Sequence, residues 1–189
     1  MKLCVLILLF VFVSTSSSQS INRIGIKGGV TYSSWSYDSP DRFELTYRRG
    51  IDLGIFTEWS NEWDFRFVNE VHYIQKGISS IIRNSQDIYR FSYLEYLSIP
   101  FLVKYRINSS SFSPALFVGP RIDYLLSFDS DLRESYRKYD IGVIIGLGID
   151  LNSTFGLEAR YNIGFSNVYS TPIENVQNRS LELLLFVAP

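Results

Sequence analysis

The sequence predicts an all-β fold, an eight-stranded antiparallel up-and-down transmembrane β-barrel. Three observations support this prediction. Apolar residues occupy every second position in eight segments, no segment after residue 20 approaches the length of a membrane-spanning helix, and short and long connections alternate between the segments. Because successive side chains of a strand point to opposite faces, each segment has one apolar face and one small or charged face.

The clearest alternation runs from Tyr139 to Phe165, in two arms joined by a short turn. Apolar residues fill one row of both arms, whereas the other row holds glycines and the opposite charges Glu158 and Arg160. Lipid on the outside and a tight, charge-compensated interior would explain both rows. The alternative is a soluble lipocalin-like barrel, whose apolar face points inward around a small ligand. The glycines count against it, because a soluble exterior rarely needs so many.

Residues 1–20 are predicted to be a cleaved signal peptide. Lys2 provides the positive start, residues 3–13 the apolar run and residues 14–20 a region of small residues. The apolar run is shorter than the ~20 residues that a spanning helix needs. Residues 21–189 therefore form one predicted barrel domain. It contains no disulfide, because the only cysteine is Cys4.

The predicted strands are joined by alternating short and long connections, as is typical of membrane barrels. The strands are residues 23–33, 47–59, 62–77, 91–107, 114–128, 139–150, 155–165 and 178–187. The tight turns lie around residues 61, 108–111 and 152–153, and the long polar segments are residues 34–46, 78–90, 129–138 and 168–177. With an even number of strands, both termini are expected at the short-turn, periplasmic end.

The polar row carries eight basic and eight acidic residues. The basic residues are Arg23, Lys27, Arg66, Lys76, Lys104, Arg106, Arg121 and Arg160, and the acidic ones are Asp52, Glu58, Asp64, Glu70, Asp123, Asp140, Glu158 and Glu182. Side chains fill the interior of an eight-stranded barrel, so its charges must neutralise one another. We therefore predict a structural interior polar network that includes Arg66, Glu70, His72, Lys104, Arg121, Asp123, Glu158 and Arg160.

Four polar residues fall on the apolar face instead. Arg49, Glu95 and Arg179 lie near the long-loop ends of their strands, where a strand extends beyond the hydrocarbon into water. Asn69 lies in mid-strand and has no such explanation. Aromatic residues also gather at strand ends, which predicts two interfacial girdles. They are Trp59, Trp63, Tyr105 and Phe155 near the tight turns, and Tyr32, Tyr47, Tyr73, Tyr93, Tyr124 and Phe165 toward the long loops.

Several segments resemble a known family. They are Ile26-Lys27-Gly28-Gly29-Val30, the run YLSIPFLVKY at residues 96–105, Gly119-Pro120-Arg121, and LEARY at residues 157–161. In order and spacing they resemble the outer-membrane β-barrels common in Bacteroidetes, called PorT-like and loosely akin to OmpA-type barrels. The resemblance implies an outer-membrane location, assembly by the barrel-insertion machinery, and an envelope or secretion partner. Ser98 departs from the pattern, since the family usually has an acidic residue there.

His72, the only histidine, is the one candidate for catalysis. A lipid-modifying hydrolase would need a serine beside the imidazole, and Ser98 on the neighbouring strand is a conceivable partner. A histidine within the interior polar network is the simpler interpretation. One histidine and no mature cysteine predict no metal site and no cofactor. A net charge of −1 gives no support for a nucleic-acid surface.

The sequence as a whole predicts a non-enzymatic integral outer-membrane barrel with a packed polar interior, so not a general porin. Its long loops are the expected contact surface, with a link to envelope integrity or protein secretion. Outer-membrane lipid, the insertion machinery and an envelope or secretion protein are the expected partners.

Overall fold

The computed structural model describes residues 21–37, 44–60, 65–82, 88–107, 112–130, 136–169 and 176–188. The predicted signal peptide, Trp63 and Asp64 lie outside these residues. The strands are β1 (Ile21–Tyr37), β2 (Glu44–Thr46), β3 (Arg48–Ser60), β4 (Phe65–Ile82), β5 (Ile88–Arg106), β6 (Ser113–Ser130), β7 (Tyr139–Asp150), β8 (Phe155–Asn167) and β9 (Val176–Val187).

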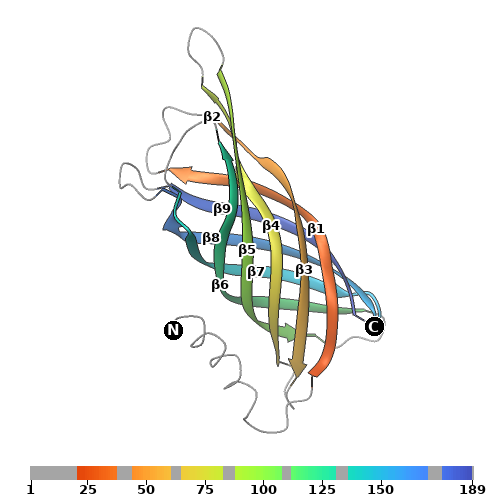
Figure 1. Cartoon of the computed structure of the whole chain (residues 1–189). Coiled ribbons are helices and arrows are strands. Elements are labelled where there is room, and N and C mark those ends of the chain that lie inside the picture. The colour runs from red at the N-terminus through yellow and green to blue at the C-terminus, as the bar shows by residue number, and fades with distance from the viewer. Residues whose placement is uncertain are drawn as a thin grey trace, which may run out of the picture.

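The strands form a single closed barrel (Figure 1). Around the ring their order is β5, β4, β3, β1, β9, β8, β7, β6, and β6 pairs with β5 to complete it. Every pairing is antiparallel, and β2 continues β3 beyond Tyr47, so eight strands surround the barrel as predicted. The beginning of β1 and the end of β9 both lie at the short-turn end. Within the described residues, no helix is long and apolar enough to cross a membrane.

The apolar rows point outward and the polar rows point inward. Ile26, Ile55, Leu147 and Phe165 are each about 60% exposed, whereas Glu158 and its neighbours on the polar row are buried. The outward direction of the apolar face is the reverse of what a soluble lipocalin-like barrel requires, so that alternative is wrong. Glycine and charge fill the lumen because side chains from all eight strands converge there.

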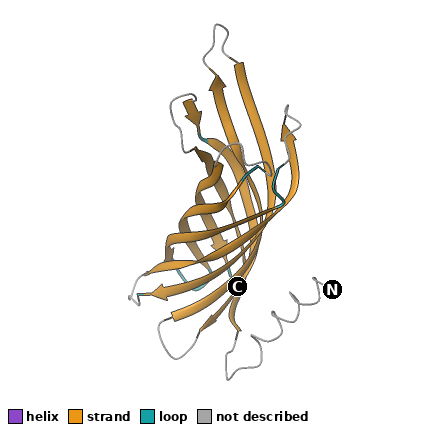
Figure 2. Cartoon of the chain, turned by 90° about the vertical axis from the view of Figure 1, so that its left-hand side faces the viewer, coloured by secondary structure: helices purple, strands orange, loops and turns teal. Residues whose placement is uncertain are grey.

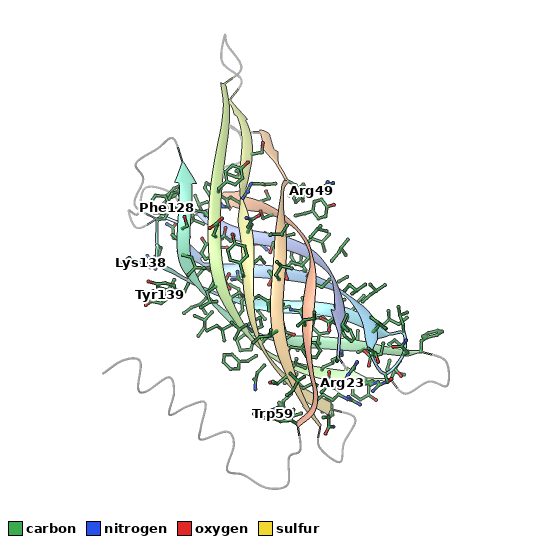
Figure 3. All side chains as sticks on the ribbon, turned by 45° about the vertical axis from the view of Figure 1, so that its right-hand side comes forward. Arg23, Arg49, Trp59, Phe128, Lys138 and Tyr139 are labelled. Atoms are coloured by element: carbon green, nitrogen blue, oxygen red, sulfur yellow. The ribbon has the colours of Figure 1, made fainter. Side chains whose placement is uncertain are left out.

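The outward polar residues lie where the alternation places them. Arg49 is exposed, Glu95 and Arg179 are half-buried, and Figure 3 shows Arg49 toward the long-loop end. Asn69 is half-buried, opposite Thr57 on β3 and Phe101 on β5. Nothing in the structure explains this asparagine.

The predicted end of the third strand at Gly77 is wrong. Lys76, Gly77 and Ile78 are all buried, so the alternation is interrupted, and Gly77 has a φ of 143°. Glycine tolerates this left-handed backbone, and the even-numbered positions still face inward at Ile78, in unchanged register with β5. Much of the predicted loop 78–90 is therefore strand, paired from Ile78–Ser92 to Ile82–Ile88.

These extensions form a feature that we call the projection: β2 with residues 79–82 of β4 and 88–91 of β5. β2 pairs with β4 along one edge, from Glu44–Ile81 to Thr46–Ser79. On the other side, the described pairing of β5 with β6 begins only at Ser92–Ser130. The ends of β4 and β5 rise past the other strands in both views (Figures 1 and 2).

The interior also contains two apolar clusters. The mouth cluster lies at the long-loop end, and the lower cluster lies in the short-turn half of the barrel. The mouth cluster comprises Trp35, Ile74, Ile78, Leu94, Tyr96, Leu125, Tyr136, Val168 and Val176. The lower cluster comprises Phe56, Val68, Leu102, Phe117, Ile144, Phe186 and Ala188. Buried charges occupy the space between and beside these clusters.

Candidate functional site: the charged interior

The centre of the barrel is crossed by an ion pair between opposite walls. Arg160 of β8 forms two bonds with Glu70 of β4, at 2.6 and 2.8 Å, and these strands are four positions apart in the ring of eight. Lys27 of β1 lies 2.6 Å from Glu70 and 2.8 Å from Glu158. Arg160 also contacts Glu158 at 2.5 Å. Bidentate arginine–carboxylate bonds are strong and directional, so they fix the two walls relative to each other.

Aromatic rings complete the surroundings of these cations. The ammonium of Lys27 lies 4.6 Å from the centroid of the Phe56 ring, and the guanidinium of Arg160 lies 5.3 Å from that of Phe117. The faces of aromatic rings attract cations, more strongly where water is excluded. The lower apolar cluster therefore supports the charged network in addition to filling volume.

His72 lies between two carboxylates. Its Nδ1 is 2.5 Å from Asp52 Oδ1, and its Nε2 is 3.0 Å from Glu70 Oε2. The space comes from Gly54 on the neighbouring strand, where a Cβ would lie only 2.5 Å from His72 Cγ. The Nδ1 contact is a hydrogen bond, whereas Nε2 lies near Glu70 without forming one.

Ser98 is directly opposite His72 in the β4–β5 ladder, as the catalytic alternative supposed. Its hydroxyl, however, donates a 2.6 Å hydrogen bond to Asp123, and both ring nitrogens of His72 face carboxylates. An imidazole that is to take a proton from serine needs a free nitrogen beside the hydroxyl. The serine–histidine pair that catalysis would need is therefore not formed. Ser98 instead supports Asp123, although it replaces the acidic residue of the resembled family.

A second set of charges, the upper network, lies toward the mouth. Lys76 is 2.7 Å from Asp123, and Arg121 contacts both Asp123 and Asp140, the latter at 3.0 Å. Asn178 donates to Asp140 at 3.3 Å. The mouth cluster lies above this set, where the Tyr136 and Tyr169 rings stack at 5.6 Å and the Trp35 ring meets Tyr169 edge-on.

The lower mouth contains the most accessible pairs. Asp150 forms ion pairs with Arg23 at 3.1 Å and with Arg106 at 3.4 Å. These two arginine side chains are 11% and 23% exposed. Arg66, 18% exposed, pairs with Glu58 on the adjacent strand. Lys104 connects this end to the central network through Glu158, at 3.4 Å.

The eight residues predicted as one network all line the interior but belong to different groups. Glu70, His72, Glu158 and Arg160 meet at the centre, with Lys104 leading to Arg66 at the lower mouth. Arg121 and Asp123 belong to the upper network. Asp150 was missed by the prediction, although it falls on the polar row of its strand. Within the described chain, no group of three metal-ligating side chains could hold a metal ion.

A family model described as "Outer membrane protein beta-barrel domain" matches residues 17–170. A comparison with curated proteins gave no match.

Three solved structures are similar to this chain. Neisserial surface protein A (NspA) is 17% identical with a TM-score of 0.55, over 90% of this chain and 99% of that one. Ail, the attachment invasion locus protein of Yersinia pestis, is 17% identical with a TM-score of 0.52, over 90% and 100%. The outer membrane enzyme PagL is 12% identical with a TM-score of 0.51, over 84% and 97%. At these identities the similarity shows the fold alone.

Proposed function

Because the chain belongs to the outer membrane protein β-barrel domain family, we propose that it is a non-enzymatic integral protein of the outer membrane with two working parts. The closed barrel is a rigid membrane anchor whose lumen is blocked to ions and solutes. The projection and the long loops beside it form the contact surface for another envelope component. The observation that carries the proposal is the Arg160–Glu70 pair, which joins opposite walls across the lumen.

The blocked lumen follows from the way its charges are arranged. A general porin keeps water between the charges of its wall, whereas here Lys27, Glu70, Glu158 and Arg160 contact each other directly with side chains at most 3% exposed. The mouth cluster adds an apolar layer above them. An ion would have to separate several buried pairs to pass, and charges separated in a buried setting are strongly unfavourable.

Single-channel recording in planar bilayers tests the blocked lumen. We expect no stable conductance from the folded protein. Steady open channels with unaltered protein would contradict the blocked lumen.

The fold itself permits catalysis, since PagL shares it and is named as an enzyme. What argues against catalysis in this chain is that His72 is 2% exposed, its Nδ1 is bonded to Asp52, and Ser98 donates to Asp123 instead of to the imidazole. We expect a His72→Ala variant to leave the lipid composition of the envelope unchanged. A change in lipid acylation that depends on His72 would replace this proposal with the enzyme alternative.

The contact surface is assigned to the projection because it extends the described strands beyond the closed ring. Among the described strands, nothing pairs with the β6-side edge of β5 before Ser92, and an open strand edge accepts a strand from another protein. The PorT-like resemblance of the sequence supports a partner in envelope integrity or protein secretion.

A shortened hairpin tests the contact surface. Ser79 and Phe91 face each other in the β4–β5 ladder, so an Asn-Gly turn can replace residues 80–90 without altering the barrel. In cells that lack the protein, this variant should fold but fail to restore detergent resistance or the normal profile of secreted proteins. The matched control replaces residues 108–111 at the opposite end and should restore both. Full restoration by the shortened variant would exclude the projection as the contact surface.

A further inference from the structure

The outer surface of the barrel carries a cationic patch that no interior network explains. Arg49 of β3 and Arg179 of β9 flank β1 on either side: Arg49 is opposite Tyr32, and Arg179 is opposite Ser34. All four residues belong to outward rows. Within the described strands, no carboxylate pairs with either arginine, in contrast to the cations of the lumen.

The two arginines lie on the outward face of the barrel, on the strands that flank β1. Two strand spacings across the sheet and two residues along it separate Arg49 from Arg179, which is about 12 Å between their backbones. The guanidinium carbon of Arg49 lies 5.5 Å from the centroid of the Tyr32 ring, so this side chain leans toward β1 and therefore toward Arg179. Guanidinium groups bind phosphate oxygens in pairs, and a tyrosine beside them suits the membrane interface.

Directly below the patch the surface is hollowed. A groove of about 570 Å³ opens on the lipid-facing side of β1, β9, β8 and β7. Two adjacent cross-strand rows form its floor. They are Gly28–Leu185–Leu157 and Val30–Leu183–Ala159.

Small residues create this hollow. Gly28 and Ala159 lie where other outward positions hold leucine or isoleucine. The barrel surface is therefore recessed on both sides of Leu183 and Leu185 of β9. The next row toward the long loops contains Arg49 and Tyr32. Val30 and Tyr32 are two residues apart on one strand, or about 7 Å. The apolar groove therefore ends where the cationic patch begins.

We propose that this surface is a binding site for a phosphate-bearing, acylated lipid of the outer leaflet. Arg49 and Arg179 bind the phosphate, Tyr32 packs beside it, and one acyl chain lies in the groove between Gly28 and Ala159. Long loops face the outside of an outer membrane, which places the arginines at the depth of the outer headgroups. The site depends on the outer-membrane location of the barrel and is independent of the projection and its partner.

Native mass spectrometry of the full mature protein in detergent tests the site with bisphosphorylated lipid A and its dephosphorylated counterpart as probes. The unaltered protein should retain one phosphorylated lipid and bind the dephosphorylated one at least tenfold more weakly. The double variant Arg49→Gln, Arg179→Gln should lose that preference. Lys138→Gln removes an exposed cation beside the start of β7, four strands from Arg49 around the ring, and should leave the preference unchanged (Figure 3).

The groove is tested by filling it. A Cβ at Gly28 would meet only Leu53 Cδ2 at 3.1 Å and Asp52 O at 3.9 Å, so Gly28→Leu should fold with a small shift of Leu53. It should weaken binding of phosphorylated lipid A severalfold, whereas Val118→Leu on the distant outer face of β6 should not. A heat-dependent shift on a gel verifies that each variant is folded.

Two results would overturn the site. Equal binding of both lipids by the unaltered protein, or an unchanged affinity in the double arginine variant, removes the phosphate site. Unchanged affinity in a folded Gly28→Leu variant removes the acyl groove.

Discussion

Arg160 and Arg66 each pair with a glutamate inside the same barrel, yet their surroundings differ. Arg160 reaches across the lumen to Glu70 with its side chain 1% exposed. Arg66 reaches only to Glu58 on the adjacent strand and is 18% exposed, at the mouth of the short-turn end. The first pair connects walls that no backbone hydrogen bond joins, whereas the second duplicates a connection that the ladder already makes. An ion pair should therefore contribute most to the stability of the barrel where it joins opposite walls across the lumen.

The largest effect is expected from Arg160→Met. It leaves Glu70 and Glu158 buried with Lys27 between them, and breaking a buried pair in this way costs about 3–5 kcal/mol. Urea unfolding in detergent micelles, followed by far-ultraviolet circular dichroism, measures the loss. The double variant Glu70→Met, Arg160→Met should recover part of it, because both charges are then gone. If the double variant is less stable than Arg160→Met by the full cost of Glu70→Met alone, the two residues act independently. The cross-lumen pair is then not the cause of the loss of stability.

An intermediate effect is expected from Gly54→Ala. The new Cβ would lie 2.5 Å from the His72 ring, so the imidazole must move away from Asp52. Overpacking of this kind costs about 1–3 kcal/mol. The same unfolding assay measures it, and Gly148→Ala is the matched control, since its Cβ would approach no heavy atom closer than 3.3 Å. If both variants lose the same free energy of unfolding, then the role of Gly54 is not to make room for the His72 ring.

The smallest effect is expected from Arg66→Gln. Its pair with Glu58 is partly exposed, and Lys104 lies 3.9 Å from the same glutamate, so the carboxylate keeps a cationic neighbour. Partly exposed pairs contribute about 0–1 kcal/mol. If Arg66→Gln loses as much free energy of unfolding as Arg160→Met under the same conditions, then the cross-lumen pair contributes no more to stability than the pair at the mouth.

The faces of the strands could be predicted from sequence because the period of a strand is two. The row that holds Glu158 and Arg160 is predicted to be interior, and both residues are buried there. Alternation says nothing about which interior charges meet. Arg160 and Glu70 are ninety residues apart in sequence, and their contact depends on the tilt and stagger of eight strands.

Two further differences between the prediction from sequence and the structure have local causes. Gly77 lies on the outward row of β4 and has no side chain, so the apolar alternation stops there in the sequence although the strand continues to Ile82. Asp150 is the last residue of β7 beside a tight turn, a position where an acidic residue also suits a loop. Its three basic neighbours are Arg23 of β1 and Lys104 and Arg106 of β5, and no local pattern indicates them.

The pairing of β1 with β9 joins the two ends of the chain. Until β9 has been added, β1 and β8 each present a strand edge of unpaired backbone N–H and C=O groups, so a partly inserted chain has two edges that can pair with other strands. The rows beneath the cationic patch run across this same seam, from Gly28 on β1 through Leu185 to Leu157 on β8. A lipid held there would fasten the seam from outside, and its presence would mark a barrel that has finished closing.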